Sequence, residues 1–201
     1  MAAENGDLWV FGYGSLMWRP GFPFRERHLA TLTGYHRSLC IFSHVHRGTP
    51  DMPGLVLGLD RGGRCRGVAF GVAATDAEAT LAYVREREQV TAVYIERHIK
   101  VRLDDGRNVP AVTYVADRAH SQYAGRLPTE ELLRLVNQGA GISGANPDYV
   151  RATHRQLIEM GVSDSILAGI AARLSQPAGD QAEAARSSTT ARRSASLSAK
   201  R

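Results

Sequence analysis

The segment Trp9-Val-Phe-Gly-Tyr-Gly-Ser-Leu-Met-Trp18 carries information on both the fold and the site. It begins as a short apolar run from Leu8 to Phe11, which predicts a buried strand. The run breaks at Gly12 and Gly14, and a strand that ends in a glycine-rich turn leaves backbone N–H groups without partners in the sheet. Because glycine lets such a backbone curl until its donors converge, the turn suits a small anion such as a carboxylate. The segment therefore predicts an enzyme for small acidic molecules.

This turn does not match the common glycine-rich motifs. Met17 stands where a dinucleotide fingerprint has its third glycine, and the turn lacks the lysine of a P-loop. Ser15 also lacks the flanking glycines of a nucleophile elbow. A plain turn after a strand is one interpretation. The other is an anion cradle formed by the backbone amides of Tyr13, Gly14, Ser15 and Leu16.

Length and composition fit one folded domain with a tail. The chain has 201 residues, of which 43% are hydrophobic and 22% charged, as in ordinary globular proteins. The net charge is +5, but the segment 175–201 alone holds five basic and two acidic residues. That segment is rich in Ser, Ala and Arg, and it predicts a disordered tail. Because the folded part shows no basic patch with interleaved aromatic residues, a nucleic-acid partner is not expected.

The cysteines and histidines do not predict a metal or a cofactor. Cys40 and Cys65 are too few for a disulfide framework and lack metal-ligand spacing. The apolar surroundings of Cys40 favour an inert, packed thiol over a nucleophile. His44 and His46 lack a third ligand nearby. Neither a signal segment nor a membrane-length apolar run is recognised, so we expect a cytoplasmic monomer without a membrane partner.

Turn signals divide the first 115 residues into strands. Gly34 is expected to break the strand region 29–43, and His44 to Gly54 forms a loop rich in glycine and proline. The turn Asp60-Arg-Gly-Gly63 predicts a hairpin of two short strands, and Asp104-Asp-Gly106 predicts another. The expected strands cover residues 8–12, 29–43, 55–59, 67–73, 93–103 and 109–115.

Helices are expected mainly later in the chain. Thr75-Asp-Ala-Glu78 has the pattern of a capping box, which predicts a helix from there to about Arg87. Asn146-Pro147 predicts a helix with Asn146 as its N-cap, and Gly161 ends it. Further helices are expected from Pro128 to Gly139 and over 163–174. Since strands come first and helices later, the sequence predicts an α+β domain over residues 1–174.

Glu88 is the strongest candidate for a general acid or base. It lies four residues after Val84 and seven after Leu81, on the apolar stripe of its helix. Glu86 lies nearer the charged side, beside Arg85. A carboxylate that points inward loses hydration, and its affinity for protons rises. A solvated charged face at the helix end is the simpler alternative.

Two further residues have open interpretations. Arg47 lies in the loop His46-Arg-Gly-Thr-Pro50, where an arginine is either a surface charge or a partner for a substrate carboxylate. Tyr149 lies three residues into the helix that Asn146 begins. It either packs in the core or contributes its hydroxyl group to a site.

Taken in order, these elements resemble the ChaC family of γ-glutamylcyclotransferases, in its glutathione-specific branch. The resemblance extends over roughly residues 8–174 and leaves the tail out. It rests on Val10-Phe-Gly-Tyr-Gly-Ser-Leu-Met-Trp18, His46-Arg-Gly-Thr-Pro50 with Pro53-Gly54, Arg87-Glu88, and Gly141-Ile-Ser-Gly144 with Asn146 and Tyr149.

The resemblance implies a compact mixed β-barrel with flanking helices and a cavity at one end. Residues Tyr13 to Leu16 would hold a γ-glutamyl group, with Arg47 and Tyr149 as further substrate contacts, and Glu88 would be the acid/base. The implied enzyme is a lyase that cyclises the γ-glutamyl group of glutathione, releasing 5-oxoproline and cysteinylglycine without a cofactor. Gln89 and Val90-Thr-Ala-Val93 depart from the family pattern, which affects mainly the cysteinylglycine end of the site.

Two alternatives stay open. The same cyclisation could act on other γ-glutamyl amines or γ-glutamyl amino acids. A non-catalytic regulatory binding protein is the alternative from another class, with the basic tail as its contact to an anionic surface.

Overall fold

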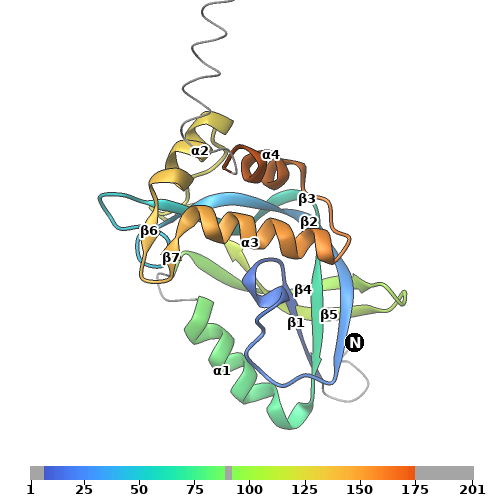
Figure 1. Cartoon of the computed structure of the whole chain (residues 1–201). Coiled ribbons are helices and arrows are strands. Elements are labelled where there is room, and N and C mark those ends of the chain that lie inside the picture. The colour runs from blue at the N-terminus through green and yellow to red at the C-terminus, as the bar shows by residue number, and fades with distance from the viewer. Residues whose placement is uncertain (1–6, 89–91, 175–201) are drawn as a thin grey trace, which may run out of the picture.

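A five-stranded barrel forms the centre of the computed structural model, which describes residues 7–88 and 92–174. The strands follow the order β1-β3-β2-β4-β5, and β5 closes the barrel by pairing in parallel with β1 (Figure 1). All other neighbours are antiparallel. The bounds are β1 Leu8–Gly12, β2 Glu26–Ser43, β3 Gly54–Val72, β4 Tyr94–Leu103 and β5 Asn108–Ala116. The predicted α+β class and mixed barrel are confirmed.

Strands β2 and β3 are longer than the sequence indicated. The predicted hairpin of 55–59 and 67–73 is wrong, because β3 runs without a break from Gly54 to Val72 and pairs along β2. Gly34 also does not end a strand. It lies in an irregularity of the ladder, opposite Gly62 and Gly63, and all three glycines have positive φ angles (94°, 98° and 71°). Such a bulge bends both strands and keeps them paired, which favours closure of a barrel.

Apolar side chains from all five strands contribute to one hydrophobic core. Alternate residues of a strand point to the same face, so the short apolar runs place side chains inside the barrel and others beneath the flanking helices and loops. Among the most deeply buried, at most 1% exposed, are Val10, Phe11, Leu32, Leu55, Leu59, Val68, Phe70, Val101 and Val112. Leu8–Gly12 is the strand that the first motif predicted, and it lies between β3 and β5.

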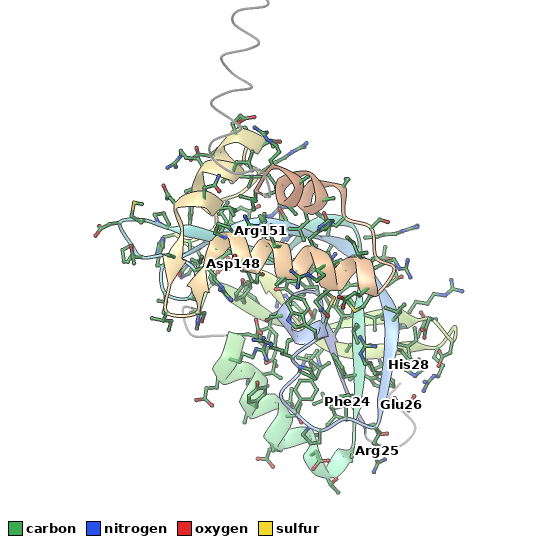
Figure 2. All side chains as sticks on the ribbon, in the orientation of Figure 1. Phe24, Arg25, Glu26, His28, Asp148 and Arg151 are labelled. Carbon is green, nitrogen blue, oxygen red and sulfur yellow. The ribbon has the colours of Figure 1, made fainter. Side chains whose placement is uncertain are left out.

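The helices flank the barrel on two sides (Figure 1). Helices α2 (Thr129–Gln138), α3 (Asn146–Glu159) and α4 (Ser165–Leu174) pack together on one side, and α1 (Ala77–Glu88) lies on another. A two-stranded hairpin of β6 (Ala140–Gly141) and β7 (Gly144–Ala145) connects α2 to α3. The ion pair between Asp148 and Arg151, with N···O 3.1 Å, lies on the solvent-facing side of α3 (Figure 2).

The predicted helices are confirmed, with one correction at the start of α1. A 3-10 turn over Ala74–Asp76 leads into α1, and the helix begins at Ala77 rather than directly after Thr75. The residue that precedes this turn is Ala73, whose side chain makes no capping hydrogen bond. The capping-box prediction therefore located the helix but not its first residue.

Some predictions concern residues outside the described ones. These are the disordered tail over 175–201 and the family departures at residues 89–91. Within the described residues, none of the helices has the length and apolar character needed to cross a membrane.

Candidate active site

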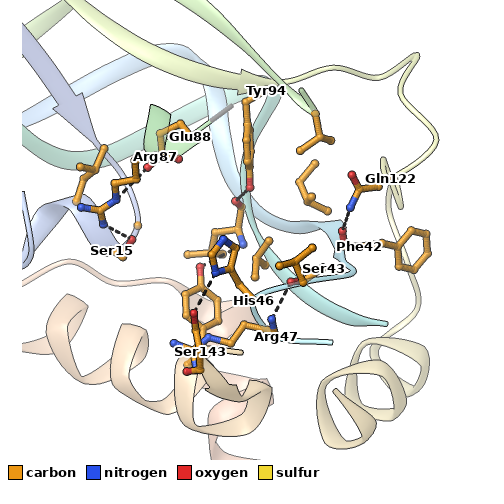
Figure 3. A pocket seen from close by; sticks show the side chains of 18 of the residues that line it. Ser15, Phe42, Ser43, His46, Arg47, Arg87, Glu88, Tyr94, Gln122 and Ser143 are labelled. Atoms are coloured by element: carbon orange, nitrogen blue, oxygen red, sulfur yellow. Dashed lines mark hydrogen bonds and ion pairs between the residues drawn. The ribbon is translucent and has the colours of Figure 1, made fainter. Parts of the chain in front are cut away.

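A cavity of about 550 Å³ lies where the turn after β1, the loop after β2, the end of α1 and helix α3 meet (Figure 3). These segments are far apart in the sequence, and the barrel brings them together. All seven residues that the sequence singled out for the site line this cavity: Tyr13, Gly14, Ser15, Leu16, Arg47, Glu88 and Tyr149.

The turn after β1 presents free backbone donors. Met17 N–H donates to Gly14 O at 2.9 Å, and Arg19 N–H donates to Ser15 O at 2.9 Å, which closes a short 3-10 turn. The N–H groups of Gly14, Ser15 and Leu16 donate to no acceptor in the part of the chain that the structure describes. Partly buried N–H groups without partners are uncommon and suit an anion or a polarised carbonyl.

The lack of a side chain matters for different reasons at Gly12 and Gly14. A Cβ atom on Gly12 would lie 2.9 Å from Leu16 Cβ, so the backbone can fold back this closely only at a glycine. At Gly14 a Cβ atom would make ordinary contacts with Leu57 (3.8 Å) and Tyr149 (4.0 Å). Both of these neighbours line the cavity. A side chain at Gly14 would therefore occupy space in the cavity.

Glu88 brings a carboxyl group into this cavity from the last residue of α1. Its side chain is 19% exposed. Burial raises its pKa above the ordinary 4.5, and the neighbouring Arg87 guanidinium, 3.5 Å away, opposes part of that rise. Glu86 is exposed, as the helix periodicity predicted. The carboxyl group at the cavity thus has an increased affinity for protons, which suits proton transfer.

Arg87 connects α1 to the turn after β1. Its Nη2 donates to Ser15 Oγ at 2.9 Å, and its Nη1 donates to Arg19 O at 2.7 Å (Figure 3). Arg87 belongs to one of the motifs found in the sequence, but no role was predicted for it. Its position directly before Glu88 was a visible signal, whereas its partner across the cavity, Ser15, depends on the fold.

Two partly buried tyrosines hold the peptide groups of Leu57 at the cavity wall. Tyr94 Oη donates to Leu57 O at 2.8 Å, and Tyr149 Oη accepts from Leu57 N–H at 3.3 Å. Burial raises the pKa of Tyr149 to about 12 and that of Tyr94 well above its ordinary value, so both phenols are neutral. No sequence pattern distinguishes Tyr94 beyond its place in a predicted strand.

Arg47 lies against the β6–β7 hairpin and is not a freely solvated surface charge. Its Nη1 donates to Ser143 O and, at 3.3 Å, to Ala145 O. Its guanidinium lies 5.3 Å from the centre of the Tyr149 ring, in a cation–π contact. Burial lowers the pKa of Arg47. The arginine is therefore fixed at the cavity wall, where it contributes positive charge.

Asn146 has another role than the predicted N-cap. The N-cap of α3 is Ala145, and the fully buried Asn146 side chain pairs with the backbone of β3. Its Oδ1 accepts from Leu55 N–H at 2.7 Å, and its Nδ2 donates to Leu55 O at 2.8 Å. The prediction was wrong because the Asn146 side chain hydrogen-bonds to the buried N–H and C=O groups of Leu55 and therefore does not cap the helix. This pair attaches α3, and with it Tyr149, to the barrel.

Of the cysteine and histidine candidates, His44 and His46 line the cavity and Cys40 does not. Cys40 is fully buried, and burial raises its pKa to about 12, so it is a packed thiol. His46 Nδ1 lies 3.0 Å from Ser143 Oγ. Among residues 7–88 and 92–174, no three His, Cys, Asp or Glu side chains are grouped to hold a metal ion.

Comparison with known proteins agrees with this geometry. The model of the ChaC-like protein family matches residues 8–176. The chain belongs to the ChaC-like family. Its curated relatives include the Escherichia coli K12 glutathione-specific gamma-glutamylcyclotransferase, 35% identical over 161 residues, which cover 80% of this chain and 70% of the relative. The human glutathione-specific gamma-glutamylcyclotransferase 1 is 34% identical over 176 residues, covering 83% and 79%.

The fold of this ChaC-like protein also has a solved counterpart. A yeast gamma-glutamyl cyclotransferase specific to glutathione superimposes with a TM-score of 0.77 at 21% identity, over 85% of this chain and 96% of that one. At this identity the likeness concerns the fold. The resemblance stated from the sequence is confirmed for both family and architecture.

Proposed function

We propose that this ChaC-like protein cyclises the γ-glutamyl group of glutathione and releases 5-oxoproline and cysteinylglycine. The observation that carries the proposal is the cavity in which a carboxyl group of raised pKa, Glu88, accompanies a turn with free N–H donors at Gly14, Ser15 and Leu16. The names of the Escherichia coli and human relatives support glutathione as the substrate.

In this reaction the substrate supplies its own nucleophile. The α-amine of the glutamyl group attacks the γ-carbonyl carbon, a carbon–nitrogen bond closes a five-membered lactam, and the amide bond to cysteine breaks. The attacking nitrogen begins as an ammonium group, and the leaving nitrogen ends as one. Two protons therefore leave the attacking nitrogen, and two reach the leaving nitrogen. No water is consumed, so the protein must mainly hold the folded-back conformer. Well-oriented intramolecular attack reaches effective molarities of about 10⁵–10⁸ M.

The turn after β1 and Arg47 are the groups we assign to binding. The N–H groups of Gly14, Ser15 and Leu16 would receive the α-carboxylate, as a set of convergent amides receives an anion. Arg47 adds positive charge at the cavity wall and Tyr149 closes the side near Leu57. Neutral phenols do not repel a substrate that carries carboxylates.

Glu88 is the group we assign to proton transfer. As a carboxylate it accepts a proton from the attacking nitrogen, and it then delivers that proton to the leaving nitrogen. A carboxyl group with a raised pKa suits both steps, because its pKa lies closer to the pH at which the enzyme works. Catalysis of this kind is typically worth about 10²–10⁴-fold in rate.

The direct test is to incubate the purified protein with glutathione and to measure products by mass spectrometry. We expect 5-oxoproline and cysteinylglycine in equal amounts, with γ-glutamyl-alanine turned over far more slowly. Release of neither product would contradict the proposal. A preference for γ-glutamyl-alanine would instead assign the cyclisation to other γ-glutamyl compounds.

We also propose that a single copy of the chain suffices for activity and that the enzyme works in the cytoplasm. The cavity of one chain already holds both Glu88 and the turn with free N–H donors, so the proposed chemistry needs no residue from a second copy. Sedimentation analysis of the active protein tests the oligomeric state, and fractionation of the producing cells tests the compartment.

A further inference from the structure

Arg37 is an arginine whose charge lies inside the protein. It comes from the middle of β2, and its side chain is only 4% exposed. An isolated guanidinium in such a place is strongly unfavourable unless its donors are satisfied. Arg37 does not line the 550 Å³ cavity, and it borders a separate cavity of about 360 Å³ instead.

The partners of Arg37 are mainly backbone carbonyl groups. Nε donates to Tyr13 O at 2.6 Å, and Nη2 donates to Arg66 O at 2.6 Å. The carboxylate of Asp164 is more distant, with Nη1···Oδ2 at 3.5 Å. The shortest contacts of this buried cation thus include the backbone of the turn after β1, at Tyr13, the residue directly before the free donors of Gly14, Ser15 and Leu16.

The geometry of the peptide group links this contact to the active-site cavity. The peptide bond between Tyr13 and Gly14 is planar and trans, as are all peptide bonds of the described residues. The carbonyl of Tyr13 and the N–H of Gly14 therefore point in opposite directions. With the carbonyl held toward Arg37, the Gly14 N–H points away from Arg37, and both Tyr13 and Gly14 line the active-site cavity.

The charge of Arg37 also acts through this peptide group. A charged donor on a carbonyl oxygen makes a short, strong hydrogen bond. It polarises the amide, so the N–H at the other end becomes a better donor, as in chains of hydrogen bonds. A positive charge thus reaches the cavity indirectly, through the Tyr13–Gly14 peptide, while the guanidinium itself stays behind the turn.

We infer that Arg37 is a positioning residue, which orients and polarises the Tyr13–Gly14 peptide so that the Gly14 N–H binds the α-carboxylate of the γ-glutamyl substrate. The inference rests on the proposed function and adds a residue that touches no substrate. Lysine cannot replace it fully, because one ammonium group lacks the fork that reaches the carbonyls of Tyr13 and Arg66 together.

The test compares two substrates in four proteins. The substrates are glutathione and 4-aminobutanoyl-cysteinylglycine, which keeps the attacking amine and the scissile amide but lacks the α-carboxylate. The measured quantity is kcat/KM for glutathione divided by kcat/KM for 4-aminobutanoyl-cysteinylglycine. The proteins are the wild type, Arg37→Met, Arg37→Lys and Thr113→Val. Thr113 is the matched control, since its fully buried side chain also donates to a backbone carbonyl, through Oγ1 to Phe11 O of β1 at 3.0 Å.

We expect the ratio to fall by about tenfold or more in Arg37→Met, the effect of losing one charge-assisted hydrogen bond to the carboxylate. Arg37→Lys should lie between Arg37→Met and the wild type, and Thr113→Val should keep the wild-type ratio even if it unfolds at a lower temperature. A purely structural role for Arg37 would reduce the turnover of both substrates alike and leave the ratio unchanged.

An unchanged ratio in either folded Arg37 variant would overturn the inference while the proposed function stands. If Arg37→Met does not fold, the ratio in Arg37→Lys decides. Absence of 5-oxoproline from the wild type with glutathione would be a different result, because it overturns the proposed function and this inference together.

Discussion

The carboxyl group of Glu88 lies mostly out of solvent at the cavity wall, and it is the group whose removal should matter most for turnover. We expect Glu88→Gln to lower kcat by about 10²–10⁴-fold, because the amide keeps the shape of the side chain but cannot carry the proton. KM should change little. Steady-state kinetics with glutathione measures both. Glu86→Gln, on the exposed face of α1, is the control and should behave as the wild type. Wild-type turnover in Glu88→Gln would remove Glu88 from the mechanism.

The same substitution should change stability with a defined dependence on pH. Burial raises the pKa of Glu88 above the ordinary 4.5, so between those two values the folded protein binds more protons than the unfolded one. Stability therefore falls as the pH rises through that window. Glu88→Gln should raise the free energy of unfolding at neutral pH and leave it nearly unchanged below pH 4.5. Urea denaturation at the two pH values measures this, and equal effects at both would contradict the assignment.

Arg87 should set the pH at which the enzyme becomes active. Its guanidinium opposes the rise in the pKa of Glu88, so Arg87→Met should raise that pKa further. We expect the acid limb of the kcat/KM profile to lie above pH 4.5 in the wild type and to move to higher pH in the variant. Arg85→Met is the control, because Arg85 pairs with Glu96 at 2.8 Å, outside the cavity. An acid limb that does not move would show that Glu88 does not control the profile.

A substitution at Gly14 tests whether the substrate needs the space beside this residue in the cavity. Because a Cβ atom there would contact Leu57 and Tyr149 at ordinary distances, Gly14→Val should fold and yet exclude the glutamyl group. We expect KM to rise by about tenfold or more, in line with the loss of well-placed binding contacts, with the thermal unfolding temperature close to that of the wild type. Near-normal KM and kcat would refute a role for this position in binding.

At the scale of elements, the Asn146 side chain makes the two shortest hydrogen bonds between helix α3 and the barrel, and Tyr149 makes a longer one. Asn146→Ala would leave the buried N–H and C=O groups of Leu55 unpaired, which costs about 2–4 kcal/mol for two such groups. Urea denaturation should show this loss. Activity should fall as well, since α3 carries Tyr149. Gln138→Ala removes a partly buried side-chain bond to Pro53 O and should cost much less. Equal losses in the two variants would contradict this account.

The long strands show where local sequence rules failed. Gly62 and Gly63 follow Asp60 and Arg61, a pattern typical of a hairpin turn, and Gly34 is typical of a break. The strands continue because β2 and β3 satisfy each other's backbone groups on both sides of the bulge. The glycines that led to the predicted turn and break do have positive φ angles, but pairing over 18 and 19 residues is a property of both strands together.

At the scale of the whole molecule, the described residues that line the cavity all lie between Tyr13 and Tyr149. Deletion of residues 175–201 should therefore leave kcat and KM for glutathione within about twofold, as for a change remote from the site. The matching control is the full-length chain at the same concentration. Loss of activity on deletion would support the alternative of a binding protein that acts through its tail.

The family, the order of most elements and seven of the residues that line the cavity could be inferred from the sequence alone. Short motifs carry that information: a strand that breaks at Gly12, a loop with Arg47, a helix whose apolar stripe includes Glu88, and a helix start beside Tyr149. These are local features, set by periodicity, glycine geometry and charge.

The hydrogen-bond partners of the buried polar groups could be identified only in the folded molecule. Asn146 pairs with Leu55, Arg87 with Ser15, and Arg37 with the carbonyl of Tyr13. The physical reason is that a buried polar group takes whichever partner the fold brings within hydrogen-bond distance, and that partner is usually remote in sequence. Closure of the barrel, which brings β1 beside β5, likewise depends on backbone pairing that no local pattern encodes.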